Sequence, residues 1–433
     1  MVKFYIMENR ARWLTDKYIL LMLLAFPLWT GFHGYRAITE AKFSFFAILT
    51  LLWLLGLLLL ALRSRRLIRP PFPSQWAALA FILSVCVSAL LSEFGSKVLL
   101  GASRYDGLLT LVLYGAVFLG VSRFGEARRR YVYALAISAG LCCAVALLQL
   151  HRINALWLFP DGLDYYDSGY KYSGAFLGTI GNTDLLAAFL CLSLPLFAVY
   201  VLLAPEKARF LLLLPAALGT YVLLRSGVAS GVLGLLCCAL FALPFLVWYR
   251  TKNVRLTVGL AAAELFLIGM GLTALYFWPG TNGTLWELSQ VLHGNVDDSF
   301  GSSRVKIWRE VLGIVGQRPL FGGGPDTLTL RTQLGFERYV EETGILLKNH
   351  VDNAHNEFLN YLVNTGAAGL LCYLALIALV LYALLRHGQG AVKPALCCAL
   401  ICYFAQSFFG LGLCLVVPLV WIFLGLGASK GGT

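Results

Sequence analysis

The sequence predicts an all-α polytopic membrane protein of about twelve transmembrane helices, with one long extracytoplasmic loop that carries short helices. Its 433 residues are 59% hydrophobic and only 13% charged, whereas soluble domains contain about 25% charged residues. Apolar segments close to the roughly 20 residues needed to cross a bilayer recur along most of the chain. These segments are continuous rather than alternating, which indicates helices and excludes the strands of a barrel.

The apolar segments divide the chain into three regions. Residues 1–277 are predicted to hold nine spans, residues 278–355 a long extracytoplasmic loop, and residues 356–433 three more spans. The first segment is not expected to be a cleavable signal peptide, because another span follows it directly. The predicted spans are residues 18–33, 43–62, 76–92, 107–121, 131–150, 185–203, 210–224, 228–249, 254–277, 356–385, 394–408 and 410–427.

The distribution of charge predicts that both termini are cytoplasmic. With the N-terminus inside, every short inner loop is net basic, as the positive-inside rule requires. The largest inner clusters are Arg63/65/66/69 and Arg123/128/129/130, and Lys430 lies beyond the last span. One span more or fewer would move later clusters to the other side. The net charge of +12 is therefore attributed to membrane topology, and no nucleic-acid partner is expected.

Two outer segments are long. Residues 151–184 are rich in Asp, Tyr and Gly. In the second, Ser302-Ser303 is expected to cap a helix that Pro319 ends, and Gly322–Asp326 is expected to form a turn. An apolar face predicts that this helix lies along the membrane surface or over the bundle. That face comprises Ile307, Trp308, Val311, Leu312 and Val315.

His355 is the first candidate functional residue. It lies where the polar loop meets an apolar run from Phe358 to Leu385, and an imidazole at the membrane boundary is suited to proton transfer. At 100° per residue, Gly366 and Gly369 are predicted on the same helical face as His355, where a neighbouring helix would pack closely. The alternative is a histidine at the end of a helix whose ring extends to the membrane–water interface and has no catalytic role.

Two arginines on the predicted outer face are the other candidates. Arg304 begins the surface helix, where its charge opposes the helix dipole by about 0.3–1 kcal/mol, and Arg225 ends the seventh span. With His355 they suit a membrane-anchored phosphate or pyrophosphate, which a guanidinium binds in bidentate fashion. The alternatives are an ion pair of Arg304 with Asp297 or Asp298, and an interfacial anchoring role for Arg225.

Other polar features predict less chemistry. Glu264, the lone acid within a predicted span, is by default a buried functional carboxylate. Adjacent Asp297 and Asp298 are more typical of a solvated loop than of a metal site. The Gly322–Gly324 run lacks the Lys-Ser/Thr of a nucleotide-binding loop. The 11 cysteines all lie in apolar segments, where they are expected to serve packing. No metal and no cofactor is expected.

The pattern around His355 resembles the O-antigen ligase/O-antigen polymerase superfamily of bacterial envelope proteins. The family pattern is His, then Asn, Ser or Gln, nine residues, Gly, two residues, and Gly, Thr or Tyr. His355, Asn356, Gly366 and Gly369 match it.

Three other segments extend the resemblance to roughly residues 175–385. Ser303–Trp308 with Pro319–Pro325 is similar to the family's arginine-containing helix and Gly-Pro turn. Gly181–Ala187, which includes Asn182, resembles the Gly-Asn segment that opens a middle span. The chain departs from the family near the eighth span, where Arg225-Ser226-Gly227 stands in place of Ser-Arg-Gly.

The resemblance implies a GT-C-like, metal-independent, inverting glycosyltransferase on the outer face of the cytoplasmic (inner) membrane. Its donor would be a glycan on undecaprenyl pyrophosphate. Its acceptor would be a hydroxyl of lipid A–core or of another glycan, lipid or protein of the envelope, as in lipopolysaccharide and cell envelope polysaccharide biosynthesis. His355, Arg304 and Arg225 would be catalytic, and Asn356, Gly366, Gly369 and Asn182 would bind substrate.

Within this hypothesis, the arginines hold the pyrophosphate and stabilise the charge that develops as it leaves. Neutral His355 accepts the proton of the acceptor hydroxyl. A polymerase of lipid-linked repeat units is the alternative within the class, and nothing in the sequence separates the two. A small-solute transporter of the bicarbonate type is less favoured, because transporters usually show repeats and several polar residues at mid-membrane depth.

Overall fold

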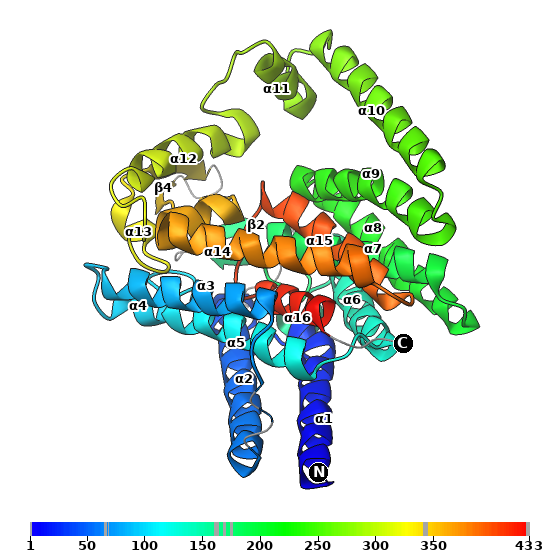
Figure 1. Ribbon diagram of the computed structural model, residues 1–433. Coiled ribbons are helices and arrows are strands. Elements are labelled where there is room, and N and C mark those ends of the chain that lie inside the picture. Colours follow the sequence, from blue (N-terminus) through cyan, green and yellow to red (C-terminus); the bar gives the residue numbers. More distant parts are fainter. Residues whose placement is uncertain are drawn as a thin grey trace.

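The computed structural model describes residues 2–64, 67, 69–159, 164–167, 170–173, 176–340 and 345–429. These residues form a body of packed helices with two short antiparallel hairpins (Figure 1). Arg65, Arg66, Lys430 and part of the Asp-, Tyr- and Gly-rich segment 151–184 lie outside the described residues. The helical class predicted from the sequence is confirmed, and the hairpins were not predicted.

A helix overlaps each of the twelve predicted spans. Among the described residues, eight helices are long and apolar enough to cross a membrane, and α5, α15 and α16 are shorter apolar helices. The α1 helix is in neither group, and the number of crossings stays a prediction. The helices that overlap the predicted spans are α1 (Val2–Leu24), α2 (Ile38–Arg63), α3 (Pro73–Leu90), α5 (Leu108–Phe124), α6 (Arg129–Leu150), α7 (Thr183–Leu203), α8 (Leu213–Ser226), α9 (Ala229–Thr251), α10 (Val254–Tyr276), α14 (Glu357–His387), α15 (Val392–Ser407) and α16 (Val417–Ala428).

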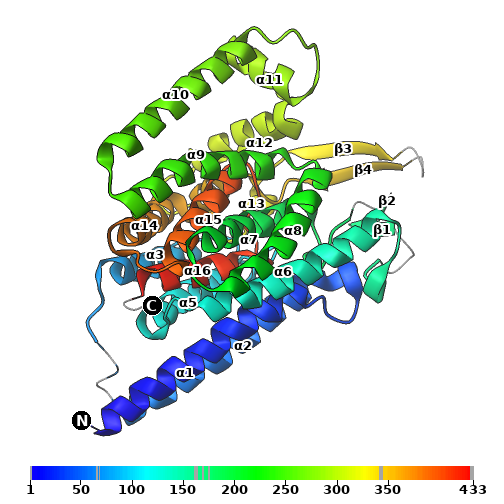
Figure 2. The same cartoon turned by 90° about the vertical axis from the view of Figure 1, so that its right-hand side faces the viewer.

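Short elements connect these helices. Within the described ranges, four 3₁₀ turns span Phe26–Leu28, Gly34–Ala37, Ala155–Trp157 and Lys207–Leu212. The short helices are α4 (Lys97–Leu100), α11 (Gly283–Leu292), α12 (Phe300–Val315) and α13 (Leu328–Arg331). Strands β1 (Asp164–Asp167) and β2 (Tyr170–Ser173) form one hairpin. Strands β3 (Gly335–Val340) and β4 (Ile345–His350) form the other, which extends away from the helices in Figure 2.

The first helix begins earlier than predicted. The apolar run suggested residues 18–33, but α1 starts at Val2 and ends at Leu24. Its polar residues have partners around the start of α6: Arg12 pairs with Glu126 in the connection before it, and Asp16 accepts a hydrogen bond from Tyr131 in its first turn. A helix can therefore continue through these residues without leaving their charges unpaired.

Contacts between helix ends group the connections into two sets. Connections that the sequence predicts on the inner side contact one another, as in the ion pair of Arg69 with Glu8 at 2.7 Å. Segments predicted to be outer also contact one another, as in the ion pair of Arg104 with Asp352 at 2.6 Å. The grouping agrees with the alternation inferred from the positive-inside rule. Which set is cytoplasmic stays a prediction.

A buried lysine fixes the hairpin of α1 and α2. The α2 helix begins five residues before the predicted span, so that Lys42 lies inside it and is fully buried. Its Nζ donates to the carbonyls of Phe26 (3.0 Å) and Pro27 (3.1 Å), where α1 has just ended. The Phe26 carbonyl also accepts from the amide of Trp29 (3.2 Å), and the Pro27 carbonyl also accepts from the hydroxyl of Thr179 (2.8 Å), so the lysine is a second donor to each. It thereby sets where the first turn of α2 lies.

The α14 helix is broken at Gly366, which corrects the predicted helical face. Gly366 has φ 71°, and a Cβ on it would meet the backbone of Leu320. Ala367 and Ala368 donate instead to the carbonyls of Pro319 (2.8 Å) and Leu320 (3.0 Å). The predicted close partner at Gly366 is therefore the turn after α12 and not a helix. Because the helix is interrupted and begins after His355, 100° spacing from the histidine does not apply.

The α12 helix also begins differently from the prediction. Gly301, Ser302 and Ser303 have left-handed backbone (φ 58–65°), and the regular helix starts at Arg304. Ser302 and Ser303 therefore do not act as predicted caps. Val315 ends the helix, four residues before Pro319. Its buried face packs over α14 through Ile307, Val311 and Ile314, whereas Leu312 is 55% exposed.

The α10 helix stands away from the main body of packed helices in both views and contacts α9 and α11 (Figures 1 and 2). It has no buried residue. Glu264 is half-buried on this helix. The expectation of a buried functional carboxylate at Glu264 is therefore wrong for this arrangement of the chain.

Candidate functional site

A cavity of about 360 Å³ contains His355 in its wall. The wall is assembled from segments far apart in the sequence, all on the predicted outer side. They are the start of α2, the loop before α5, the start of α7, the loop before α14 and the connection between α15 and α16. The lining residues lie within 35–40, 104–105, 181–185, 352–355 and 411–415.

The backbone around His355 is fixed by local hydrogen bonds. The His355 amide donates to Oδ1 of Asn353 at 3.0 Å. Trp308 of α12 donates from Nε1 to the carbonyl of Ala354 at 3.0 Å. The next residue, Asn356, caps α14 by accepting from the amide of Leu359 at 3.0 Å. The imidazole is therefore held at the beginning of α14 by contacts on both sides of the chain.

The surroundings of His355 favour its neutral form. Burial lowers the pKa of His355 most, because the charged imidazolium is poorly solvated. The positive charges of Arg304 and Arg104 lower this pKa further, whereas the carboxylates of Asp184 and Asp352 oppose them. Since the pKa lies below its ordinary value of about 6.5, the imidazole is neutral at pH 7 and able to accept a proton.

Arg304 lies near His355 and makes no ion pair with an acid in the described part of the chain. Its Nε donates to the carbonyl of Phe409 at 3.1 Å, and its Nη1 donates to that of Gly301 at 2.8 Å. Asp298 pairs instead with Arg309 at 2.6 Å, and Asp297 accepts from Ser299. The predicted alternative of an Arg304 ion pair with these acids is therefore not observed.

Arg104 is a cavity residue that the sequence reasoning missed. Its Nε donates to Oδ2 of Asp352 at 2.6 Å. Its amide, and the amide and hydroxyl of Ser103, donate to the carboxylate of Asp326. Two acids of the long loop therefore hold this arginine beside His355. The available signal was the polar sequence Gly101–Gly107 in a short loop between two apolar segments.

Three of the nine described non-glycine residues with left-handed backbone lie at this cavity. Outside glycine such conformations are uncommon and cost about 1–3 kcal/mol each. His355 (φ 49°) and Tyr105 (φ 58°) lie in the cavity wall, and Asp326 (φ 51°) supports it. Each has neighbouring contacts that fix it. The strain therefore positions the histidine and the loop that carries Arg104.

Glu357 ties the start of α14 to α15. It is 3% exposed, and its two carboxylate oxygens accept from the hydroxyls of Tyr373 (2.6 Å) and Tyr403 (2.7 Å). A Cβ on Gly412 would meet the Glu357 side chain, so the cavity segment that contains Gly412 packs directly on this carboxylate. Glu357 thus links the histidine segment to the connection between α15 and α16.

The predicted substrate-binding residues lie in different places. Asn182 lines the cavity, and its Oδ1 caps α7 by accepting from the amide of Leu185 at 3.1 Å. Asn356, Gly366 and Gly369 are not among the described residues that line it. The first caps α14, and Gly366 admits the turn at Leu320. Gly369 faces Thr365 and, on α3, Ser84.

Arg225 also lies outside the cavity wall. It is exposed in the last turn of α8. The α9 helix begins three residues after α8 ends, and its Gly231 packs against Ala187 near the start of α7. Arg225 is therefore on the same side of the helices as the cavity. The structure does not bring it to His355.

Comparison with known proteins agrees with the resemblance noted in the sequence. Residues 214–374 match the family model described as O-Antigen ligase. This range includes Arg225, Arg304 and the histidine motif, whereas Arg104 and Asn182 lie before it. No curated protein matches the chain.

Proposed function

The chain belongs to the O-antigen ligase superfamily, and from this premise we propose that it transfers a glycan from undecaprenyl pyrophosphate to an acceptor hydroxyl on the outer face of the cytoplasmic membrane. The observation that carries the proposal is one cavity whose wall contains Arg104 and a buried, neutral imidazole. Arg304 is not among the described residues that line this cavity, but its charge acts on the same imidazole. Such a site can accept a proton and stabilise an anionic leaving group together.

The roles follow from charge and position. Arg304 and Arg104 bind the pyrophosphate and stabilise the negative charge that develops on it. Arg225 lies on the same side of the helices and contacts the donor only outside the cavity. Asp184 and Glu40, which also line the cavity, accept hydrogen bonds from sugar hydroxyls. Arginines and carboxylates in one cavity suit a ligand that joins an anionic pyrophosphate to a sugar.

The proposed step is a single displacement at the anomeric carbon. The acceptor oxygen forms a bond to that carbon while the bond from the carbon to the pyrophosphate oxygen breaks. The leaving oxygen keeps the electron pair, and His355 takes the proton of the acceptor hydroxyl, which it later releases to water. Attack opposite the leaving group inverts the anomeric centre. The step as written uses no metal ion.

The test is transfer by purified protein. Wild-type protein and His355→Ala are incubated with an undecaprenyl-pyrophosphate glycan and candidate acceptors, and the products are analysed by mass spectrometry. A glycosylated lipid A–core or other envelope acceptor indicates a ligase. Elongation of a second lipid-linked glycan indicates a polymerase. Solute uptake into vesicles without any glycan transfer would contradict the proposal.

A further inference from the structure

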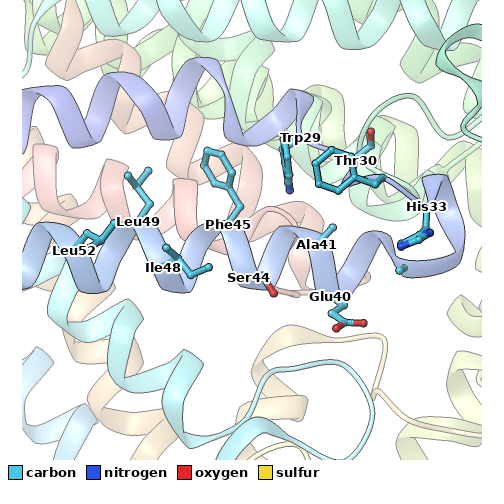
Figure 3. A pocket seen from close by; sticks show the side chains of 13 residues that line it. Trp29, Thr30, His33, Glu40, Ala41, Ser44, Phe45, Ile48, Leu49 and Leu52 are labelled. Carbon is cyan, nitrogen blue, oxygen red and sulfur yellow. The ribbon is translucent and has the colours of Figure 1, made fainter.

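An apolar groove of about 570 Å³ runs along α2 (Figure 3). One side is formed by α2 residues at helical spacing, and the other by the connection between α1 and α2. Aromatic rings meet across the groove: the ring centroids of Trp29, in the connection, and Phe45, on α2, are 5.8 Å apart, and those of Trp29 and Phe32 are 5.6 Å apart. The groove therefore has an apolar, aromatic wall beside a membrane-facing helix.

Polarity changes along the groove. Figure 3 shows Leu52, Leu49 and Ile48 at one end, and Glu40 with His33 at the other. The α2 helix begins at Ile38, so the groove reaches about 20 Å along the helix axis. This length covers the outer half of a hydrocarbon core that is about 30 Å thick. The groove is thus polar where the predicted outer boundary lies and apolar below it.

The polar end of the groove meets the cavity that contains His355. Ala37 and Glu40 line both spaces. Phe43, on α2, stacks on Tyr105 of the cavity wall with ring centroids 5.0 Å apart. This contact holds α2, and with it the groove, against the cavity wall. Ile48 and Leu52 are 60% and 62% exposed, so the other end is accessible from the hydrocarbon.

We propose that this groove binds the polyisoprenyl chain of the lipid-linked donor, with the isoprene units nearest the pyrophosphate against Trp29 and Phe45. The proposal rests on the proposed function and adds where the carrier lipid lies. A polyisoprenyl pyrophosphate has one chain and one anionic head, which matches one groove joined to one arginine-containing cavity. A lipid with several acyl chains would need a wider apolar face at the same junction.

Chain-length dependence tests the proposal. Ile48→Trp places an indole toward the apolar end of the groove, beyond the units that lie against Trp29 and Phe45. Leu58→Trp is the matched control, because Leu58 is exposed on α2 beyond the groove. Transfer is measured with the same glycan on geranyl and on undecaprenyl pyrophosphate. A geranyl chain has only the two units nearest the pyrophosphate, so Ile48→Trp is expected to raise KM for the undecaprenyl donor about tenfold or more and to leave KM for the geranyl donor unchanged. Leu58→Trp is expected to change neither. Equal effects of Ile48→Trp on both donors, or no effect, would overturn the groove assignment.

A binding measurement separates failure of the groove from failure of the proposed function. Wild-type protein in phospholipid vesicles is irradiated with a photoreactive undecaprenyl phosphate, and the labelled peptides are identified by mass spectrometry. Labels within residues 29–52 support the groove even if no glycan is transferred from any donor. Labels elsewhere, or equal labelling of this segment by a photoreactive diacyl phospholipid, would overturn it.

Discussion

Arg104 and Asp352 form an ion pair with a Nε–Oδ2 distance of 2.6 Å between residues 248 positions apart. The pair joins the loop before α5 to the loop that carries His355. Asp326 holds the same loop through the amide of Arg104 at 2.9 Å. Asp352 fixes the guanidinium and Asp326 fixes the backbone beside it, so little side-chain entropy is lost when an anion binds.

Loss of the His355 imidazole is expected to abolish most transfer. His355→Gln keeps a polar side chain but cannot act as the base, so kcat should fall by about 10²–10⁴-fold. His387→Gln is the control, because His387 lies in the last turn of α14, at the other end of the helix. Initial rates of glycan transfer check this expectation. Equal rates for His355→Gln and the control would contradict a base role.

The pH dependence of kcat/KM should move in opposite directions for two cavity variants. The Arg104 charge lowers the pKa of His355 and the Asp184 charge raises it. Because the neutral imidazole is the active form, kcat/KM falls as the pH drops below the pKa of His355, and this fall is the acidic limb of the profile. Arg104→Gln should raise that pKa and move the acidic limb to higher pH. Asp184→Asn should lower it and move the limb to lower pH.

These shifts distinguish an electrostatic role from a structural one. A loop that is merely loosened would lower the rate at every pH and leave the limb in place. Arg104→Lys retains the charge and is expected to keep the limb close to that of the wild type. The same direction of shift for Arg104→Gln and Asp184→Asn would show that His355 is not the titrating group.

Arg304 should matter more than Arg225 for the chemical step. Arg304→Ala is expected to lower kcat/KM by about 10²–10³-fold, as for loss of one preorganised donor to a developing charge. Arg225→Ala should lower it by less than about tenfold, because Arg225 is exposed outside the cavity wall. Arg309→Ala on the same helix as Arg304 is the control. A larger loss for Arg225→Ala would require that α8 moves toward the cavity when substrate binds.

Gly366→Ala should destabilise the protein. The added Cβ would meet the Leu320 backbone, and alanine would have to adopt φ 71°, so the free energy of unfolding should fall by about 3 kcal/mol or more. Gly313→Ala on α12 is the control, because nothing lies within 4 Å of its added Cβ. It should stabilise the helix by about 0.5–1 kcal/mol. Thermal unfolding in detergent measures both, and equal stabilities would contradict the break at Gly366.

Local composition determined the helical class, the approximate positions of the spans and the grouping of their ends. Hydrophobicity and charge act segment by segment, since each segment must satisfy the bilayer and the positive-inside rule on its own. Short stretches of sequence also made His355 and Arg304 candidates, through the histidine motif and the arginine at the start of the surface helix. Arg104 was not predicted as a site residue, because nothing within its own loop shows that Asp326 and Asp352 will contact it.

Tertiary structure decided the contents of the cavity and the role of the glycines. Two glycines 11 and 14 residues after His355 are compatible with a continuous helix face, yet the chain breaks at Gly366 to admit the turn of Pro319 and Leu320. That choice depends on a segment more than 40 residues away. The join between the groove and the cavity likewise exists only once α2 packs beside Tyr105, so no local pattern could specify it.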